Sequence, residues 1–184
     1  RFNLSTLGAG IYLGNSSFLK MNGGNISNNI AYNHSIVNTN AEYTQNKTAK
    51  GIHQQCNGVG LYITTNSEAD LVYGEISGNV AKNLSSTTLF TSTNSEFKSK
   101  VYSLNNSVYG IGIYAAGSKL KLSDNFVMKG NKAEIDETIT IGQNTSVESS
   151  INASVRGGQI YCTNSDITID GANVYNGISN TNES

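Results

Sequence analysis

Four copies of a short motif that combines glycine with tyrosine constrain this chain more than any other feature of its sequence. The tyrosines of successive copies are about 50 residues apart. The copies are Gly8-Ala-Gly-Ile-Tyr-Leu13, Gly58-Val-Gly-Leu-Tyr-Ile63, Gly110-Ile-Gly-Ile-Tyr-Ala115 and Gly157-Gly-Gln-Ile-Tyr-Cys162. Self-similarity at a fixed period of this length is typical of proteins built from stacked structural repeats.

Two further short segments follow each motif at similar distances. The first alternates in polarity and comprises Leu19-Lys-Met21, Ala69-Asp-Leu71, Leu120-Lys-Leu122 and Ile167-Thr-Ile169. The second comprises Asn25-Ile-Ser-Asn-Asn29, Glu75-Ile-Ser-Gly-Asn79, Val127-Met-Lys-Gly-Asn131 and a degenerate copy, Val174-Tyr-Asn-Gly177. Each run is too short for a helix and has the period of two that is typical of strands.

Three short strands joined by turns describe one coil of a parallel β-helix. A coil cannot bury its apolar face alone, whereas stacked coils share a continuous interior. We therefore predict an all-β fold, a single parallel β-helix domain over 1–184 with coils at 7–31, 57–81, 109–133 and 156–180. The composition agrees, because the chain is poor in strong helix formers and has no proline.

The stretches between the coils lack the motif. They are Tyr32–Cys56, Lys82–Val108 and Glu134–Val155. They form either three long inserted loops or further degenerate coils, and we favour the loops. Solenoids need polar caps at their ends. Since neither terminus resembles one, we expect a fragment of a longer solenoid.

The alternation assigns residues to the two faces of each strand. We expect one buried column of Ile11, Leu61, Ile113 and Ile160. We expect an outward column of Gly10, Gly60, Gly112 and Gln159 beside the tyrosines. Two outward columns of alternating charge follow, Lys20/Asp70/Lys121 and Glu68/Lys119/Asp166, and a column of Asn29, Asn79 and Asn131 at one corner.

The two cysteines are expected to be free thiols. Cys56 precedes the second coil and Cys162 lies in the fourth. Two coil steps are roughly 10 Å, beyond the ~7 Å limit between the Cα atoms of a disulfide. We expect Cys162 to be buried in the core and Cys56 to be the more reactive thiol.

Charge and hydropathy exclude several function classes. The formal net charge is −1, whereas nucleic-acid binding needs clustered Lys and Arg against phosphates. No stretch approaches the ~20 consecutive apolar residues that cross a bilayer. We therefore expect no nucleic-acid partner and no membrane span in this segment.

The motifs resemble those of polymorphic outer membrane proteins. The glycine-containing motifs look like the family's Gly-Gly-Ala-Ile motif, and Ile26-Ser-Asn-Asn29, Ile76-Ser-Gly-Asn79 and Met128-Lys-Gly-Asn131 look like its Phe-x-x-Asn motif with another apolar residue in place of Phe. The resemblance covers the coils and not the connecting stretches. It implies a right-handed parallel β-helix, and a surface or adhesin domain.

An enzyme is not the favoured hypothesis, although β-helices also host polysaccharide lyases and hydrolases. The charged columns indicate salt-bridging ladders rather than an acid/base pair. His34 and His53 have no partner at ligand spacing, and Glu134, Asp136 and Glu137 are more simply a solvated acidic segment than a Ca²⁺ site. We predict no catalytic residue, no metal and no cofactor.

The candidate binding surface is the tyrosine column Tyr12, Tyr62, Tyr114 and Tyr161. It forms either a shallow groove for a sugar or partner chain, or a ladder that stabilises the sheet. Possible N-glycosylation sequons begin at Asn3, Asn15, Asn25, Asn33, Asn46, Asn83, Asn105, Asn144, Asn152 and Asn182.

The leading hypothesis is a non-catalytic extracellular or cell-surface protein, an adhesin-type stalk that presents loops on a β-helix. Its partners would be a protein or carbohydrate surface ligand, copies of itself, or further solenoid coils. The alternatives are a subunit of an extracellular filament and, third, a carbohydrate-active β-helix enzyme.

Overall fold

The structure is a computed structural model that describes residues 2–39, 47–49, 52–89, 99–101, 104–141, 145–147, 151–175 and 178–183. These residues form strands in five stacked sheets, and every strand pair is parallel. No helix occurs among them, and so none that is long and apolar enough to cross a membrane. The fold class is therefore all-β with stacked parallel sheets.

Each sheet collects the equivalent strands of successive repeats and is named here by its first strand. The β1 sheet contains β1 (Phe2–Leu7), β6 (Ile52–Asn57), β11 (Leu104–Tyr109) and β16 (Ile151–Arg156). The β2 sheet contains β2 (Ile11–Leu13), β7 (Leu61–Thr64), β12 (Ile113–Ala116) and β17 (Ile160–Thr163). The β3 sheet contains β3 (Phe18–Ser27), β8 (Glu68–Ser77), β13 (Lys119–Lys129), β18 (Asp166–Asp170) and β19 (Asn173–Val174).

Two further sheets, together with β6, β11 and β16 of the β1 sheet, fall mainly in the connecting stretches. The β4 sheet contains β4 (Ile30–Thr39), β9 (Val80–Leu89), β14 (Lys132–Ile141) and β20 (Ile178–Glu183). The β5 sheet contains β5 (Lys47–Ala49), β10 (Ser99–Val101) and β15 (Thr145–Val147). The expectation of long inserted loops is therefore wrong for the described parts of these stretches.

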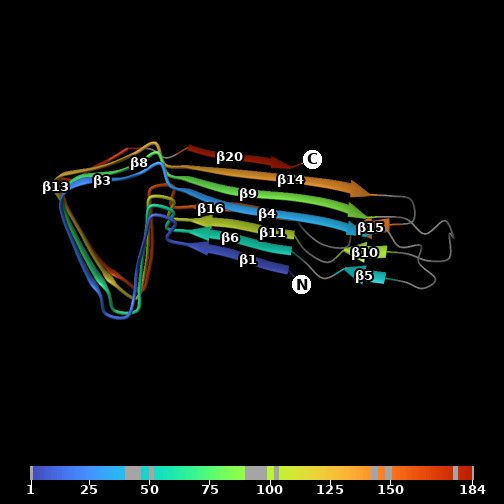
Figure 1. Cartoon of the computed structure of the whole chain (residues 1–184), viewed down its shortest axis with the longest axis horizontal. Helices are drawn as coiled ribbons and strands as arrows, with labels where there is room; N and C mark the ends of the chain where they lie inside the picture. The colour runs from blue at the N-terminus through green and yellow to red at the C-terminus, as the bar shows by residue number, and fades with distance from the viewer. Residues whose placement is uncertain are drawn as a thin grey trace.

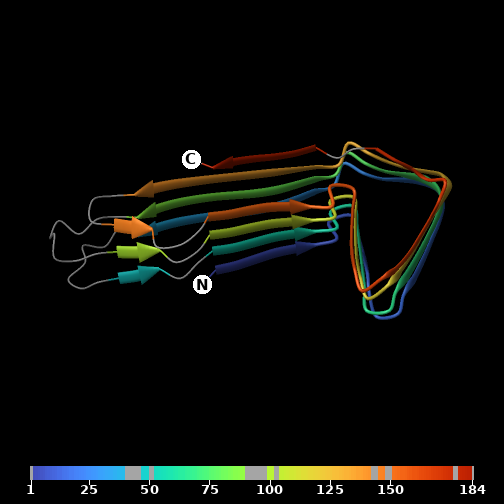
Figure 2. The same ribbon diagram turned by 180° about the vertical axis from the view of Figure 1, so that it is seen from behind.

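The repeating unit is consequently larger than the 25-residue coil expected from the motifs. The paired residues of successive repeats are about 50 residues apart, as the pairing of Ile11 with Leu61 and of Leu61 with Ile113 shows. Each repeat contributes one described strand to a sheet, except that the fourth contributes both β18 and β19 to the β3 sheet and none to the β5 sheet. Figures 1 and 2 show a three-sided end formed by the β2 and β3 sheets with their corners, from which the β1 and β4 sheets extend together as two long layers.

An apolar core fills the three-sided end. Leu61 and Ile113 are fully buried there, and Ile11 and Ile160 pack against them from the end coils. The four residues are neighbours in the strand register, which confirms the predicted column. The Leu19/Met21, Ala69/Leu71 and Leu120/Leu122 pairs of the β3 sheet pack in the same cluster.

A second core lies between the β1 and β4 sheets and mixes small apolar residues with amides. Ala31, Cys56 and Val108 are buried in one cluster, and Gln54 donates a hydrogen bond from Nε2 to Ser35 Oγ at 3.0 Å. Amide side chains replace the regular apolar alternation in these strands. Without that alternation the sequence pattern favoured loops.

The fourth coil differs from the expectation for its β3-sheet residues. Ile167 and Ile169 are in register with Leu120 and Leu122, but their side chains are 40% and 54% exposed. They lie on β18, the last strand in the order of that sheet, where no further described strand covers them.

We predict that Leu61→Ala destabilises the fold by about 2–5 kcal/mol, because it leaves a cavity in a fully buried column. Ile169→Ala is the matched control and should cost about 1 kcal/mol or less, since that side chain is half exposed. Urea unfolding followed by circular dichroism measures both. Equal costs for the two variants would contradict the described core.

Candidate functional site

The four motif tyrosines form one continuous stack along the coils. The ring centroids of Tyr12 and Tyr62 are 5.2 Å apart, those of Tyr62 and Tyr114 4.9 Å, and those of Tyr114 and Tyr161 5.5 Å. The interplanar angles are 14°, 1° and 22° in the same order. Equivalent positions in parallel strands are about 4.8 Å apart, so strand register alone places the rings face to face.

This stacking determines what the tyrosine column offers a ligand. Tyr62 and Tyr114 each have a tyrosine on both ring faces, so a sugar cannot lie flat on either ring. Tyr12, at the end of the stack, is 54% exposed. The geometry therefore favours a stabilising ladder whose outward part is a row of ring edges and hydroxyl groups.

The hydroxyl groups of the central rings are neutral at physiological pH. Burial, with smaller contributions from the neighbouring tyrosines, raises the pKa of Tyr62 and of Tyr114 above the usual value. A side-chain hydrogen bond with Thr64, the last residue of β7, partly offsets this rise in the pKa of Tyr62. The column thus presents uncharged hydrogen-bonding groups.

An asparagine ladder lies inside one corner, as predicted. Asn29 donates from its backbone N and from Nδ2 to Asn79 Oδ1, at 3.0 and 2.9 Å. Asn79 donates in the same way to Asn131 Oδ1, at 3.0 and 2.8 Å. The Asn79 amide also donates to the carbonyl of Ile26 at 3.0 Å, so this amide connects its own coil with both neighbours.

Gln159 completes this ladder, and its predicted outward position is wrong. Its side chain is buried, and Oε1 accepts a hydrogen bond from Asn131 Nδ2. The prediction failed because the chain bends just before each β2-sheet strand, where Gly157 has a φ of 61°. A bend resets the alternation, so side chains on its two sides cannot be assigned from one period.

The equivalent glycines face the ladder for the same reason. A Cβ atom on Gly60 would lie 2.7 Å from the Gly112 carbonyl oxygen and 3.0 Å from Asn79 Nδ2. Gly10 and Gly112 meet equivalent atoms, so the outward assignment of all three was also wrong. The motif therefore has a glycine at this position because the ladder and the next coil approach the backbone closely.

A second amide cluster surrounds Cys56 between the β1 and β4 sheets. Asn33 Nδ2 donates to Asn83 Oδ1 at 3.0 Å and to Cys56 Sγ at 3.2 Å. The thiol itself donates to Asn83 Oδ1 at 3.0 Å. Burial raises the pKa of Cys56 to about 12, so this thiol is a buried hydrogen-bonding group and not a nucleophile.

Both cysteines are free, as predicted, but their relative accessibility is the reverse of the expectation. Cys56 is fully buried, whereas Cys162 packs against the edge of the core and is half-buried. Burial raises the pKa of Cys162 less, to about 11. The expectation was wrong because it placed Cys56 in a loop instead of strand β6.

The charged columns have the predicted register. Lys20 Nζ lies 3.9 Å from Asp70 Oδ2, and Lys119 pairs in register with Glu68 on one side and Asp166 on the other. The acidic segment lies on strand β14, where Glu134 contacts Lys132 at 2.6 Å and Lys82 at 2.9 Å. Hydrogen bonds from these lysines hold the pKa of Glu134 below its usual value.

No metal site is found in the part of the chain that the structure describes, where no group of three His, Cys, Asp or Glu side chains converges. The His34 ring lies 5.7 Å from that of Tyr32, and His53 Nδ1 lies 3.4 Å from Asn105 Nδ2.

The predicted sequons fall into three groups. Asn15 and Asn25 are exposed, whereas the buried amides of Asn33 and Asn83 are bonded inside the fold, which leaves no room for a glycan in the folded chain. Asn105 is half-buried beside His53. The described residues do not include Asn46 or Asn144, and the side chains of Asn3, Asn152 and Asn182 lie outside the description.

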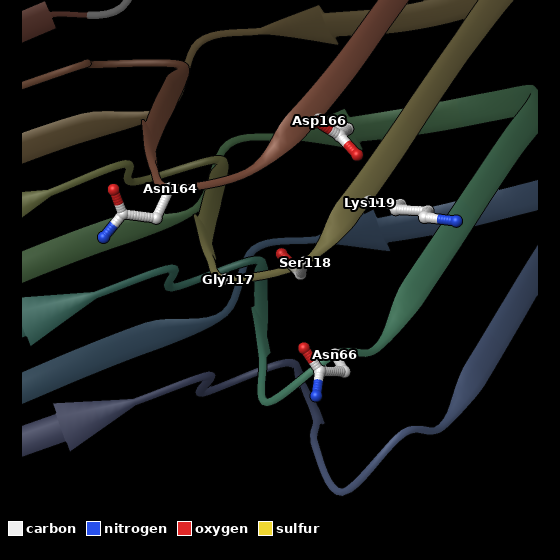
Figure 3. Close-up of a pocket in the computed structure, with 6 residues that line it drawn as sticks. All are labelled: Asn66, Gly117, Ser118, Lys119, Asn164 and Asp166. Atoms are coloured by element: carbon white, nitrogen blue, oxygen red, sulfur yellow. The ribbon is translucent and has the colours of Figure 1, made fainter.

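A recess of about 360 Å³ lies at the corner between the β2 and β3 sheets (Figure 3). It is lined by Asn66, Gly117, Ser118, Lys119, Asn164 and Asp166. Figure 3 shows Lys119 and Asp166 on one side of the Gly117–Ser118 segment, Asn164 on the other, and Asn66 on the neighbouring coil. Of these residues, only Lys119 and Asp166 belong to a column identified from the sequence.

The recess coincides with a difference in sequence between neighbouring corners, of which the second is one residue longer than the third and fourth. The second and fourth coils have Asn66 and Asn164 immediately before a serine, and the third coil has Gly117 there. All three residues have a positive φ, 56°, 48° and 56° respectively. A Cβ on Gly117 would meet no atom within 4 Å, so the glycine leaves open the space that an asparagine occupies on either side.

No protein-family model matches this chain, and neither a curated protein nor a solved structure matches it.

We predict that Asn79→Ala lowers the free energy of unfolding by about 2–5 kcal/mol. The change leaves the part-buried backbone N and Nδ2 of Asn29 without their acceptor, and it removes the Nδ2 donor from Asn131 Oδ1 and from the Ile26 carbonyl. Asn25→Ala, at an exposed position, is the control and should stay within about 0.5 kcal/mol of the wild type. Urea titration measures both, and a wild-type midpoint for Asn79→Ala would exclude a stabilising ladder.

We also predict that native labelling with a maleimide modifies Cys162 well before Cys56, because Cys56 is completely buried and has the higher pKa. Peptide mass spectrometry at several times measures the order, and Cys162→Ser should leave a native chain that labels slowly. Labelling of Cys56 first, or a mass deficit of two hydrogens, would contradict the described packing.

Proposed function

We propose that this chain is a right-handed parallel β-helix that serves as a non-catalytic extracellular or cell-surface protein, an adhesin-type stalk. The observation that carries this proposal is the repetition of the same side-chain ladders from coil to coil. The tyrosine stack and the asparagine ladder occupy the motif positions of successive coils. The most regularly repeated polar side chains, the tyrosines and asparagines of the motifs, therefore contact equivalent residues of neighbouring coils.

The charged positions support the same hypothesis. A general acid and base need carboxyl groups with separate environments and a substrate between them. Here Glu134 is held between two lysines, and Glu75 accepts a hydrogen bond from Lys129 at 2.8 Å, which lowers its pKa. Carboxylates in such pairs stabilise an outer surface rather than transfer protons.

The resemblance of the motifs to polymorphic outer membrane proteins also favours a surface role. In this proposal, the first glycine of each motif forms the corner, and the coils extend the domain along one axis. The glycine at the third position of the first three copies accommodates the asparagine ladder. The strands of the β4 and β5 sheets extend away from the three-sided end (Figure 2). In this proposal, the sequence can vary at their distant ends without disturbing the apolar core.

A binding assay paired with a turnover assay tests this function. The purified chain, labelled fluorescently, is incubated with immobilised neutral and acidic polysaccharides and with whole cells, and bound label is measured. The same mixtures are assayed for new reducing ends and for unsaturated uronate absorbance. We expect saturable binding without release of products.

Three results would overturn the proposal. Product release that is lost in Asp70→Asn would identify a carbohydrate-active enzyme. Concentration-dependent end-to-end assembly in analytical ultracentrifugation, without binding to any surface, would favour a filament subunit. Absence of both binding and assembly would exclude a surface-ligand role.

A further inference from the structure

We propose that the corner recess binds a neutral carbohydrate, with one sugar ring seated over Gly117 between the second and fourth coils. The proposal deepens the proposed function, on which it rests, by naming a ligand class and a site. The site is separate from the tyrosine column, whose central ring faces are already covered by neighbouring rings.

The size and chemistry of the recess support a small polyhydroxylated ligand. Its volume of about 360 Å³ falls within the range of ligand pockets, roughly 300–1,000 Å³. Such pockets are usually apolar, whereas this lining provides two amides, a hydroxyl, an ammonium and a carboxylate. A ligand that is polar around its whole edge matches this lining better than an aromatic or aliphatic one.

The charges in the recess favour a neutral ligand. Lys119 and Asp166 are register neighbours of opposite sign, so their contributions cancel. A carboxylate accepts hydrogen bonds from hydroxyl groups, an ammonium donates to them, and each amide does both. Adjacent hydroxyls of a sugar ring can therefore pair with neighbouring groups of the lining, whereas an anionic or cationic ligand would be repelled by one of the two charges.

The backbone of the corner is already paired, and the buried Ser118 hydroxyl lies 3.4 Å from the Ser165 hydroxyl, so a ligand would meet the exposed Asn66, Lys119, Asn164 and Asp166 side chains. Asn66 N donates to the Gly117 carbonyl at 2.9 Å, Gly117 N to the Thr163 carbonyl at 3.0 Å, and Asp166 N to the Ser118 carbonyl at 2.9 Å. These bonds fix the recess from three coils at once. The lining is therefore held in place before a ligand arrives, which reduces the cost of ordering it on binding.

The strand residue that precedes the recess is also smaller in the third coil than in its neighbours. The residue before Gly117 is Ala116, whereas the register equivalents in the second and fourth coils are Thr64 and Thr163. The third coil thus has a smaller side chain than both neighbouring coils at two successive positions, Ala116 and Gly117. A second sugar unit would extend over these two positions, toward the hydroxyl group of Tyr114.

The test uses Gly117→Asn, which introduces the residue that precedes the corner serine in the second and fourth coils. The variant should fold normally, since asparagine accepts the positive φ seen at Asn66 and Asn164 and the new Cβ meets no atom within 4 Å. Its side chain should fill the recess. Gly130→Asn is the matched control, because Gly130 also has a positive φ, its Cβ would be 3.9 Å from the nearest atom, and Asn28 occupies a similar corner in the first coil.

Saturation-transfer NMR is measured for both variants and the wild type with D-galactose, D-mannose, D-glucose, L-fucose and N-acetyl-D-glucosamine, and with D-glucuronate as a charged comparison. We expect transfer to at least one neutral sugar from the wild type and from Gly130→Asn, and a loss of about tenfold in affinity in Gly117→Asn. Circular dichroism and urea midpoints check that both variants remain folded.

The outcomes separate this proposal from the broader function. Transfer that is unchanged in Gly117→Asn overturns the recess as the site and leaves the surface function intact. Transfer to glucuronate alone overturns the neutral-ligand class. Transfer to none of the sugars overturns carbohydrate binding at this site, whereas the surface function is tested separately by the binding, turnover and assembly assays described above. If Gly117→Asn proves unfolded, Asp166→Asn and Lys119→Gln, at exposed positions, replace it, and unchanged transfer in both overturns the proposal.

Discussion

The parallel pairing of each repeat with the next is the constraint on which the rest of this structure depends. Once Ile11 is paired with Leu61, and Leu61 with Ile113, every side chain of a coil stands over its equivalent in the previous coil. Identical residues therefore interact with each other. An asparagine is well suited to such a position, since its side chain both donates and accepts, and a tyrosine is well suited because its two faces can each cover another ring.

Each repeat has two interior regions, which are stabilised by different interactions. In the three-sided end, close-packed Leu, Ile and Met side chains exclude water. Between the β1 and β4 sheets, Asn33, Asn83 and Gln54 satisfy one another or nearby backbone groups. The first region gains stability mainly from buried apolar area, and the second from hydrogen bonds among buried amides. The burial of an amide is costly where a partner is missing, as it is for Gln54 Oε1.

The sequence was sufficient to predict the strands around each motif, because there the apolar alternation is regular. It failed for the β4 sheet, where Asn33 and Asn83 occupy inward positions that a hydrophobicity pattern reads as solvent-facing. It also failed for Gln159, because a bend resets the alternation. The recess was not predicted, since the missing side chain at Gly117 becomes visible only when the equivalent corners are compared in register.

In each sheet, a strand pairs only with strands of the adjacent repeats, and this has a mechanical consequence. Strand β6 is bonded to β1 and β11 and to no more distant strand of its sheet, so each repeat is held only by its immediate neighbours. A force that pulls one end of the chain away from the stack loads the hydrogen bonds of the outermost repeat one after another. Repeats would then detach singly, each releasing about 50 residues, or roughly 170 Å of extended chain. The domain would thereby lengthen in steps while its remaining coils stay intact.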